Sequence, residues 1–232
     1  MWSNFVAHPM FGVGITLGVY ALAQLLYRRF HFILLNPVAV SIVTIILLLA
    51  ACEVPYSSYA AGGDLVLFLL GPAVVALGLP LYQQRQEILK RKLPILVGVV
   101  AGAVASIVSA SGLALLLGGS DGVVRSLAPK SVTTPIAIGI AEMIGGIAPL
   151  TAALVVLTGC LGAICGPEFC RLIGIRSRVA SGLSVGTASH GIGTARMLEV
   201  NALSGAVSGL AIGLNGLVTA FILPLLIYFF YS

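Results

Sequence analysis

Two stretches of this chain place polar and charged side chains inside otherwise apolar sequence. The first, residues 126–135, reads Ser-Leu-Ala-Pro-Lys-Ser-Val-Thr-Thr-Pro. The second, residues 186–196, reads Gly-Thr-Ala-Ser-His-Gly-Ile-Gly-Thr-Ala-Arg. Hydroxyl, imidazole and cationic groups are the donors that bind carboxylates. In a membrane, an irregular polar run is tolerated only where protein covers it or where it lines a wet cavity. The two stretches therefore predict a site that binds or transports an anion.

The first stretch predicts an anion site around Lys130. Pro129 suits the first position of a helix, which would place Lys130 at the positive end of the helix dipole. A lysine deep in a membrane also costs about 3 kcal/mol. A bound carboxylate would offset both penalties through Lys130 and the hydroxyls of Ser131, Thr133 and Thr134. The alternative is that Lys130 extends to the membrane surface and the hydroxyls bond their own backbone.

The second stretch predicts a polar helix face. On a continuous helix, Thr187, His190, Gly191 and Thr194 share one side. His190 could donate to an anion or carry a proton that is coupled to transport. The alternative is close packing of two helices through small residues, with His190 hydrogen-bonded between them.

Charged residues near these stretches are weaker candidates. Glu142 lies in an apolar segment and joins His190 as a candidate for proton coupling. Arg196 and Glu199 are three residues apart and can pair at the membrane edge. The complete set of predicted substrate-binding residues is Lys130, Ser131, Thr133, Thr134, Thr187, Ser189, His190, Thr194 and Arg196.

Composition indicates an integral membrane protein. The chain has 232 residues, of which 59% are hydrophobic and 8% charged, whereas soluble domains contain about 25% charged residues. Basic residues lie in short loops between apolar segments, which indicates membrane topology and argues against a nucleic-acid partner. The four cysteines lack metal-ligand spacing, and no motif for catalysis or for a cofactor is present. We therefore expect a single transmembrane domain over residues 1–232 and no enzyme activity.

Hydropathy predicts an all-α protein of about seven to eight transmembrane segments. The basic residues of loop 83–92 place that loop in the cytoplasm, and the N-terminus is expected outside, without a cleaved signal. Residues 171–178 carry three arginines, which would lie outside if segments 130–144 and 147–166 were both full spans. They stay cytoplasmic if segment 129–144 is re-entrant, the option we favour, or if the two segments form one span plus a half-helix. The spans are expected at residues 5–27, 32–51, 65–82, 93–117, 147–166 and 202–228, with a loop at 53–64 and a second irregular element at 179–196.

A short echo within the chain suggests an internal repeat. Residues 70–75 (Leu-Gly-Pro-Ala-Val-Val) resemble residues 127–132 (Leu-Ala-Pro-Lys-Ser-Val). Transporters built from repeats bind substrate at Gly- or Pro-interrupted segments in the two halves. The match is short, so coincidence is the alternative. Small residues could also form a homodimer contact, the candidates being Gly145, Gly146, Gly205 and Gly209.

The same motifs resemble those of the LrgB/CidB family of bacterial membrane proteins. The resemblance rests on residues 129–137 (Pro-Lys-Ser-Val-Thr-Thr-Pro-Ile-Ala), on Gly-Thr-Ala-Ser-His at 186–190 with Gly-Thr-Ala-Arg at 193–196, and on Gly-Pro-Ala-Val-Val-Ala-Leu at 71–77 with Pro-Leu-Tyr at 80–82. It extends over nearly the whole chain, in order.

The resemblance implies two competing functions in a bacterial inner membrane. One is holin-like or antiholin-like control of murein hydrolase activity and cell lysis, together with a small LrgA/CidA-like membrane partner. The other follows from plastid glycolate/glycerate translocators and from bacterial pairs linked to pyruvate uptake, and it implies transport of small monocarboxylates. A pore made by lateral assembly does not require Lys130 and His190 at membrane depth, so we favour transport.

Overall fold

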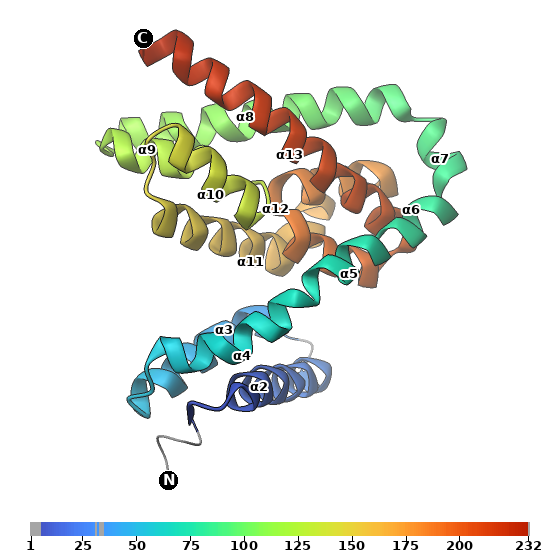
Figure 1. Cartoon of the computed structure of the whole chain (residues 1–232). Helices are drawn as coiled ribbons and strands as arrows, with labels where there is room; N and C mark the ends of the chain where they lie inside the picture. The colour runs from blue at the N-terminus through green and yellow to red at the C-terminus, as the bar shows by residue number, and fades with distance from the viewer. Residues whose placement is uncertain (1–5, 31, 33–34, 232) are drawn as a thin grey trace. The chain divides into compact units, whose positions relative to one another are not determined.

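The computed structural model describes residues 6–30, 32 and 35–231, and it is helical (Figure 1). The described residues contain no strand. Among the described residues, five helical segments are long and apolar enough to cross a membrane, which confirms an all-α polytopic membrane protein. These candidate spans are Pro9–Phe30, Tyr56–Gln83, Lys92–Leu116, Ala148–Leu172 and Ala202–Phe229.

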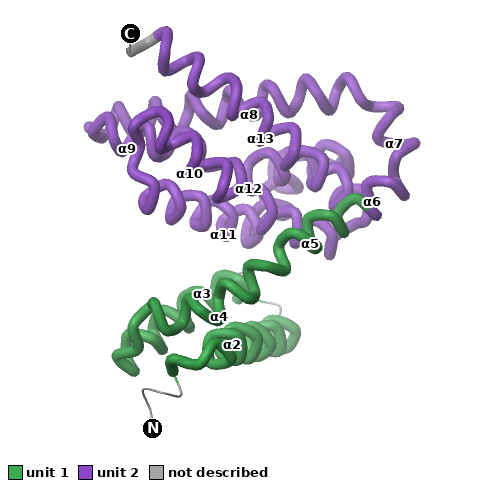
Figure 2. The backbone as a smooth tube through the Cα atoms, viewed as in Figure 1, with its two compact units in different colours: residues 1–78 green, residues 79–232 purple. Residues whose placement is uncertain are grey.

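The chain divides into two compact units, residues 1–78 and 79–232 (Figure 2). The first contains α2 (Pro9–Phe30), α3 (Pro37–Ala51), α4 (Tyr56–Phe68) and α5 (Leu70–Ala76). Asn36 caps α3, its side-chain oxygen accepting hydrogen bonds from the N–H groups of Val38 and Ala39 at 3.0 and 3.2 Å. The whole-chain domain remains a prediction, since each unit has its own set of internal contacts.

The predicted loop at residues 53–64 is mostly helix, and this prediction was wrong. Helix α4 begins at Tyr56, directly after Pro55. The predicted span that follows is instead interrupted twice. Pro72 and Pro80 lack an N–H group and cannot bond the carbonyls four residues earlier, and α4 and α5 end at those residues, Phe68 and Ala76.

The second unit holds both polar stretches. It comprises most of α6 (Gly78–Gln83), then α7 (Arg85–Leu89), α8 (Lys92–Leu116), α9 (Asp121–Leu127), α10 (Thr134–Met143), α11 (Ala148–Leu172), α12 (Arg178–Val200) and α13 (Ala202–Tyr231). Ile95 clusters with Val207, and Ile107 clusters with Leu223. Residue numbers therefore rise together along α8 and α13, so these two helices run parallel.

Helix α12 folds back on itself at His190. The backbone there has φ 41° and ψ −138°, which is not helical. Val185 and Met197 belong to one core cluster, although a straight helix would separate them by about 18 Å. A Cβ atom on Gly193 would lie 2.9 Å from Cγ1 of Val185. The predicted irregular element is thus confirmed as a helical hairpin, and the prediction of one continuous polar face was wrong because the helix turns within it.

The other polar stretch forms a second hairpin, α9–α10. At its open end, Arg125 donates to the Ile144 carbonyl at 3.1 Å, and the Ile147 N–H donates to Ser126 Oγ at 2.7 Å. Residues 128–133 form the turn between its arms. Pro129 does not start a helix, contrary to prediction. It follows the end of α9, where its nitrogen has no N–H to bond the carbonyl four residues earlier.

Helix α10 begins at Thr134 instead, with Pro135 within its first two residues. Lys130 therefore lies in the turn, where its N–H donates to the Leu127 carbonyl at 3.1 Å. The argument from a helix dipole at Lys130 does not apply.

The two hairpins enter the unit from opposite ends. Hairpin α9–α10 opens between the end of α8 and the start of α11, whereas hairpin α12 opens between the end of α11 and the start of α13. Residues 129–144 thus form the turn and second arm of a hairpin and no full-length span, which agrees with the favoured arrangement, although the hairpin already begins at Asp121. The short sequence echo between residues 70–75 and 127–132 does not correspond to the two hairpins, because residues 70–75 lie in helix α5 while residues 128–132 form a turn. The repeated pattern is one long helix followed by one hairpin.

Close packing of α12 on α13 depends on Gly186. A Cβ atom there would approach the Ser208 carbonyl oxygen to 2.5 Å, whereas one on Gly191 would meet nothing within 4 Å. We expect Gly186→Ala to lower the free energy of unfolding by about 1–3 kcal/mol. The matched variant Gly191→Ala should leave it nearly unchanged. Thermal unfolding of both variants in detergent checks this, and equal stability of the two would contradict the packing described.

Candidate functional site

The tips of the two hairpins meet between α11 and α13. Asn215 of α13 donates through Nδ2 to the Ser131 carbonyl at 3.1 Å and to the Thr187 carbonyl at 3.0 Å. Val155 of α11 clusters with Val132 of one tip, and its carbonyl accepts from His190 Nε2 of the other at 2.9 Å. The two polar stretches, about 55 residues apart in sequence, therefore form one site in the residue 79–232 unit.

Lys130 lies at this junction beside two hydroxyl groups. Its ammonium donates to Ser131 Oγ at 3.0 Å and to Ser106 Oγ of α8 at 3.3 Å. The two serine oxygens are 2.7 Å apart. An ammonium has three donors, and no ion pair to Lys130 occurs among the described residues. A half-buried cation without a counter-charge, next to two hydroxyls, is an arrangement that binds a carboxylate.

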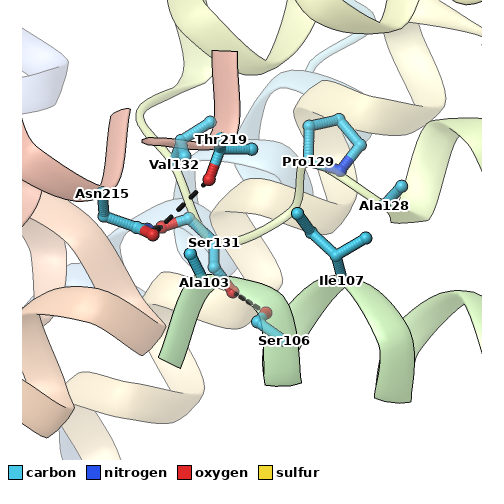
Figure 3. A pocket seen from close by; sticks show the side chains of 9 residues that line it. All are labelled: Ala103, Ser106, Ile107, Ala128, Pro129, Ser131, Val132, Asn215 and Thr219. Carbon is cyan, nitrogen blue, oxygen red and sulfur yellow. Dashed lines mark hydrogen bonds between the residues drawn. The ribbon is translucent and has the colours of Figure 1, made fainter. Parts of the chain in front are cut away.

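A small cavity adjoins the first tip (Figure 3). Its space is too narrow to hold a water molecule. Any carboxylate ligand would therefore reach this cavity only after the surrounding helices separate. The lining residues are Ala103, Ser106, Ile107, Ala128, Pro129, Ser131, Val132, Asn215 and Thr219.

Thr187 supplies a buried hydroxyl near the same junction. Its Oγ1 atom has no hydrogen-bond partner among the described residues, and the residue is 5% exposed. A Cβ atom on Gly102 would lie 2.9 Å from the Thr187 methyl group, so the side chain faces α8. A buried hydroxyl without a partner costs about 1–3 kcal/mol, and a ligand that accepts its proton would remove that cost.

The second tip is tightly hydrogen-bonded. His190 is buried, and its positive φ is unfavourable for a residue other than glycine. The Thr194 hydroxyl donates to the His190 carbonyl at 2.9 Å and lies 2.6 Å from Ser208 Oγ. Ser189 packs directly on Gly162 of α11. In this structure, Thr194 and Ser189 stabilise the tip, while the His190 ring faces α11.

Two predicted residues, Arg196 and Glu142, lie away from the tips. Arg196 is six residues beyond the turn and pairs with Glu168 at 3.5 Å and Glu199 at 3.0 Å, so its pairing with Glu199 is as expected. Glu142 is exposed in the last turn of α10. Glu142 lies at the far end of α10 from the turn that holds Lys130, and the structure does not bring it to His190.

Thr133 and Thr134 are half-buried and begin α10 immediately after the tip. They remain candidates for a ligand that enters from the α10 side. No group of three or more metal-binding side chains occurs in the part of the chain that the structure describes.

Sequence reasoning missed the residues that other helices contribute. Ser106 comes from α8, and Asn215 and Thr219 come from α13, where Thr219 donates to Asn215 Oδ1 at 3.5 Å. A signal for the α13 residues was present, because buried polar positions recur along that apolar helix at intervals of four, seven and four. Such spacing keeps them on one face. These positions are Ser204, Ser208, Asn215 and Thr219.

The fold and the site together define a polytopic α-helical membrane protein in which two opposed re-entrant hairpins meet at a polar junction. The chain matches the LrgB-like family over residues 16–229, and it belongs to that family. The match includes both units and both hairpin tips.

The relatives that this chain resembles are similar over nearly their full length. The Bacillus subtilis (strain 168) protein YwbG is 37% identical over 93% of this chain and 96% of its own. The holin-like protein CidB of Staphylococcus epidermidis is 32% identical over 94% of this chain and 95% of its own. The antiholin-like protein LrgB of Bacillus cereus (strain B4264) is 31% identical over 95% of this chain and 96% of its own. No solved structure matches the chain.

Proposed function

We propose that this protein transports small monocarboxylates of the glycolate, glycerate or pyruvate type. The observation that carries the proposal is the half-buried Lys130 ammonium, which lies beside two hydroxyls where the hairpins meet and has no counter-charge among the described residues. Re-entrant elements that meet near the middle of a membrane are a recurring substrate site in transporters. A carboxylate would take the third donor of Lys130.

The proposed mechanism is alternating access. The cavity at the first tip has no room for a water molecule, so movement of one hairpin would open the site to one side of the membrane and movement of the other would open it to the opposite side. The carboxylate would bind Lys130 and Ser131, while the Thr187 hydroxyl would bond a second oxygen of the substrate. His190, whose ring bonds the Val155 carbonyl, is the proposed site for coupling to a proton. Glu142 is a weaker candidate because of its position.

We propose that this transporter lies in a bacterial inner membrane, with its N-terminus on the outer side and loop 83–92 on the cytoplasmic side. Arginines at the end of α11 and the start of α12 lie at the same end of the unit as loop 83–92, because Val179 clusters with Ile88 and Ile95. The positive-inside rule then places that end in the cytoplasm. We propose an LrgA/CidA-like small membrane protein as its partner, with a homodimer as the alternative assembly.

The second candidate function is holin-like or antiholin-like control of murein hydrolase activity and cell lysis. The names of the relatives from Staphylococcus epidermidis and Bacillus cereus favour it. It predicts that the protein acts on membrane permeability or on lysis without a saturable substrate.

Uptake of radiolabelled glycolate, glycerate and pyruvate into proteoliposomes distinguishes the two functions. The protein would be tested alone and with an LrgA-like partner, against empty liposomes and a dye-leakage control. We expect saturable uptake of at least one of these acids without dye leakage. Dye leakage, or no uptake in any combination together with a lysis phenotype in cells, would support the holin-like function instead.

A further inference from the structure

A second cavity in the residue 79–232 unit is lined by aliphatic side chains and two cations. Its volume is about 420 Å³, which lies within the range of ligand-binding clefts. Helices α6, α7, α8 and α13 form its walls. The lining residues are Leu81, Arg85, Ile88, Leu89, Lys92, Ile95, Leu96, Leu210 and Leu214. We call this cavity the leucine groove.

The leucine groove opens at the surface of the unit. Ile88 and Ile95 are buried in the core beneath it, whereas Leu89 is 62% exposed and Leu96 is 48% exposed. Its apolar walls would contact hydrocarbon wherever they lie in a membrane. The groove also reaches the start of α8, next to the basic loop 83–92, so we expect it at the boundary between hydrocarbon and headgroups.

The two cations of the groove differ from their neighbours in lacking a carboxylate. Lys90 and Arg91 both pair with Glu87, at 2.8 and 2.6 Å, and these contacts hold the pKa of Glu87 below its ordinary value. Arg85 and Lys92 form no ion pair among the described residues, and no acidic residue lines the groove.

Arg85 is held in place at the rim. Its guanidinium donates to the Tyr82 carbonyl at 3.0 Å and lies 4.2 Å from the centre of the Tyr82 ring. The single hydrogen bond from Nη1 leaves other guanidinium donors available. A fixed guanidinium and a nearby ammonium above an apolar slot match the charge and shape of a phospholipid.

We propose that the leucine groove binds an anionic phospholipid, with an acyl chain against the leucines and the phosphate between Arg85 and Lys92. This inference goes beyond the proposed transport function and does not depend on it. Leu214 immediately precedes Asn215, the residue that holds both hairpin tips. A bound lipid would therefore contact α13 one residue away from the junction.

Lipid binding is tested on the purified full-length protein in a neutral detergent. Native mass spectrometry and thermal unfolding would compare phosphatidylglycerol with phosphatidylcholine of the same acyl chains. We expect phosphatidylglycerol to bind about tenfold more tightly, and the Arg85→Gln/Lys92→Gln variant to lose that preference. Lys90→Gln removes a charge from the same loop without touching the groove, and it should keep the preference.

Three results would overturn the proposal. Equal binding of the two lipids would show that the groove is covered by any membrane lipid and does not recognise an anionic headgroup. Equal stabilisation by inorganic phosphate would show an anion site that needs no acyl chain. A change of oligomeric state in Leu214→Trp, without loss of lipid, would show that a second copy covers the groove. If the double variant fails to fold, binding of phosphatidylglycerol, phosphatidylcholine and inorganic phosphate to the wild-type protein still tests the proposal.

Discussion

Replacing Lys130 with alanine should greatly reduce carboxylate uptake while the protein still inserts and folds. The ammonium is the cation at the junction of the hairpin tips, and a hydrogen bond to a charged group contributes about 1.5–3 kcal/mol. Its loss should therefore weaken substrate binding by roughly 10- to 100-fold. The serine hydroxyls of positions 106 and 131 can still bond each other, so the local structure should persist.

Uptake into proteoliposomes, measured over a range of substrate concentrations, checks this result. Lys130→Arg keeps the charge and should retain partial uptake, while Lys90→Ala removes a lysine outside the site and should have no effect. The thermal unfolding midpoint of Lys130→Ala should equal or exceed that of the wild type, because an unpaired cation at membrane depth is unfavourable for folding. Unaltered uptake in Lys130→Ala would remove Lys130 from the site.

Hydropathy and charge predicted much of the fold because a bilayer restricts the choices. Long apolar segments had to be helices, and keeping the arginines of residues 171–178 on the side of loop 83–92 excluded a full span at residues 129–144 followed by another at 147–166. The structure has a hairpin in place of the first of these. The same argument identified residues 179–196 as irregular, and the turn at His190 lies within them.

Local rules failed where tertiary packing determined the backbone. Pro129 and Pro135 both suit a helix start, and the sequence offers no way to choose between them. The structure starts a helix only near Pro135, because Ser131 and Val132 must reach α8 and α11 in the turn. In the same way, the helical spacing of Thr187 and Thr194 assumed a continuous helix and could not reveal a turn between them.

The site was predicted only from residues that stand out in the sequence. Lys130, Thr187 and His190 were conspicuous because they interrupt apolar sequence. Ser106 and Asn215 are among several polar residues in long apolar helices, and their particular role follows from contacts with residues 25 and 84 positions away. A pairwise contact across that distance has no local pattern in one sequence.

The strained backbone at His190 leads to the second large expected effect. His190→Gly should be more stable than His190→Ala by about 1–3 kcal/mol, since glycine tolerates this positive φ and alanine does not. Both variants lose the bond to the Val155 carbonyl, so that loss cancels in the comparison. In an ordinary helix the order is reversed, with alanine favoured by about 1 kcal/mol. Ala188→Gly, two residues earlier and exposed, should show that ordinary order.

Thermal and denaturant unfolding of the three variants measure the order of stability, and uptake measures the role of the imidazole. Alanine more stable than glycine at position 190 would mean that the chain does not turn there. Loss of uptake in both variants, with His190→Gly properly folded, would assign the ring to transport or proton coupling. Full uptake in His190→Gly would mean that the ring only holds the turn against α11. In that case the strain at the tip serves the hairpin geometry, and substrate recognition rests on Lys130 and the hydroxyls around it.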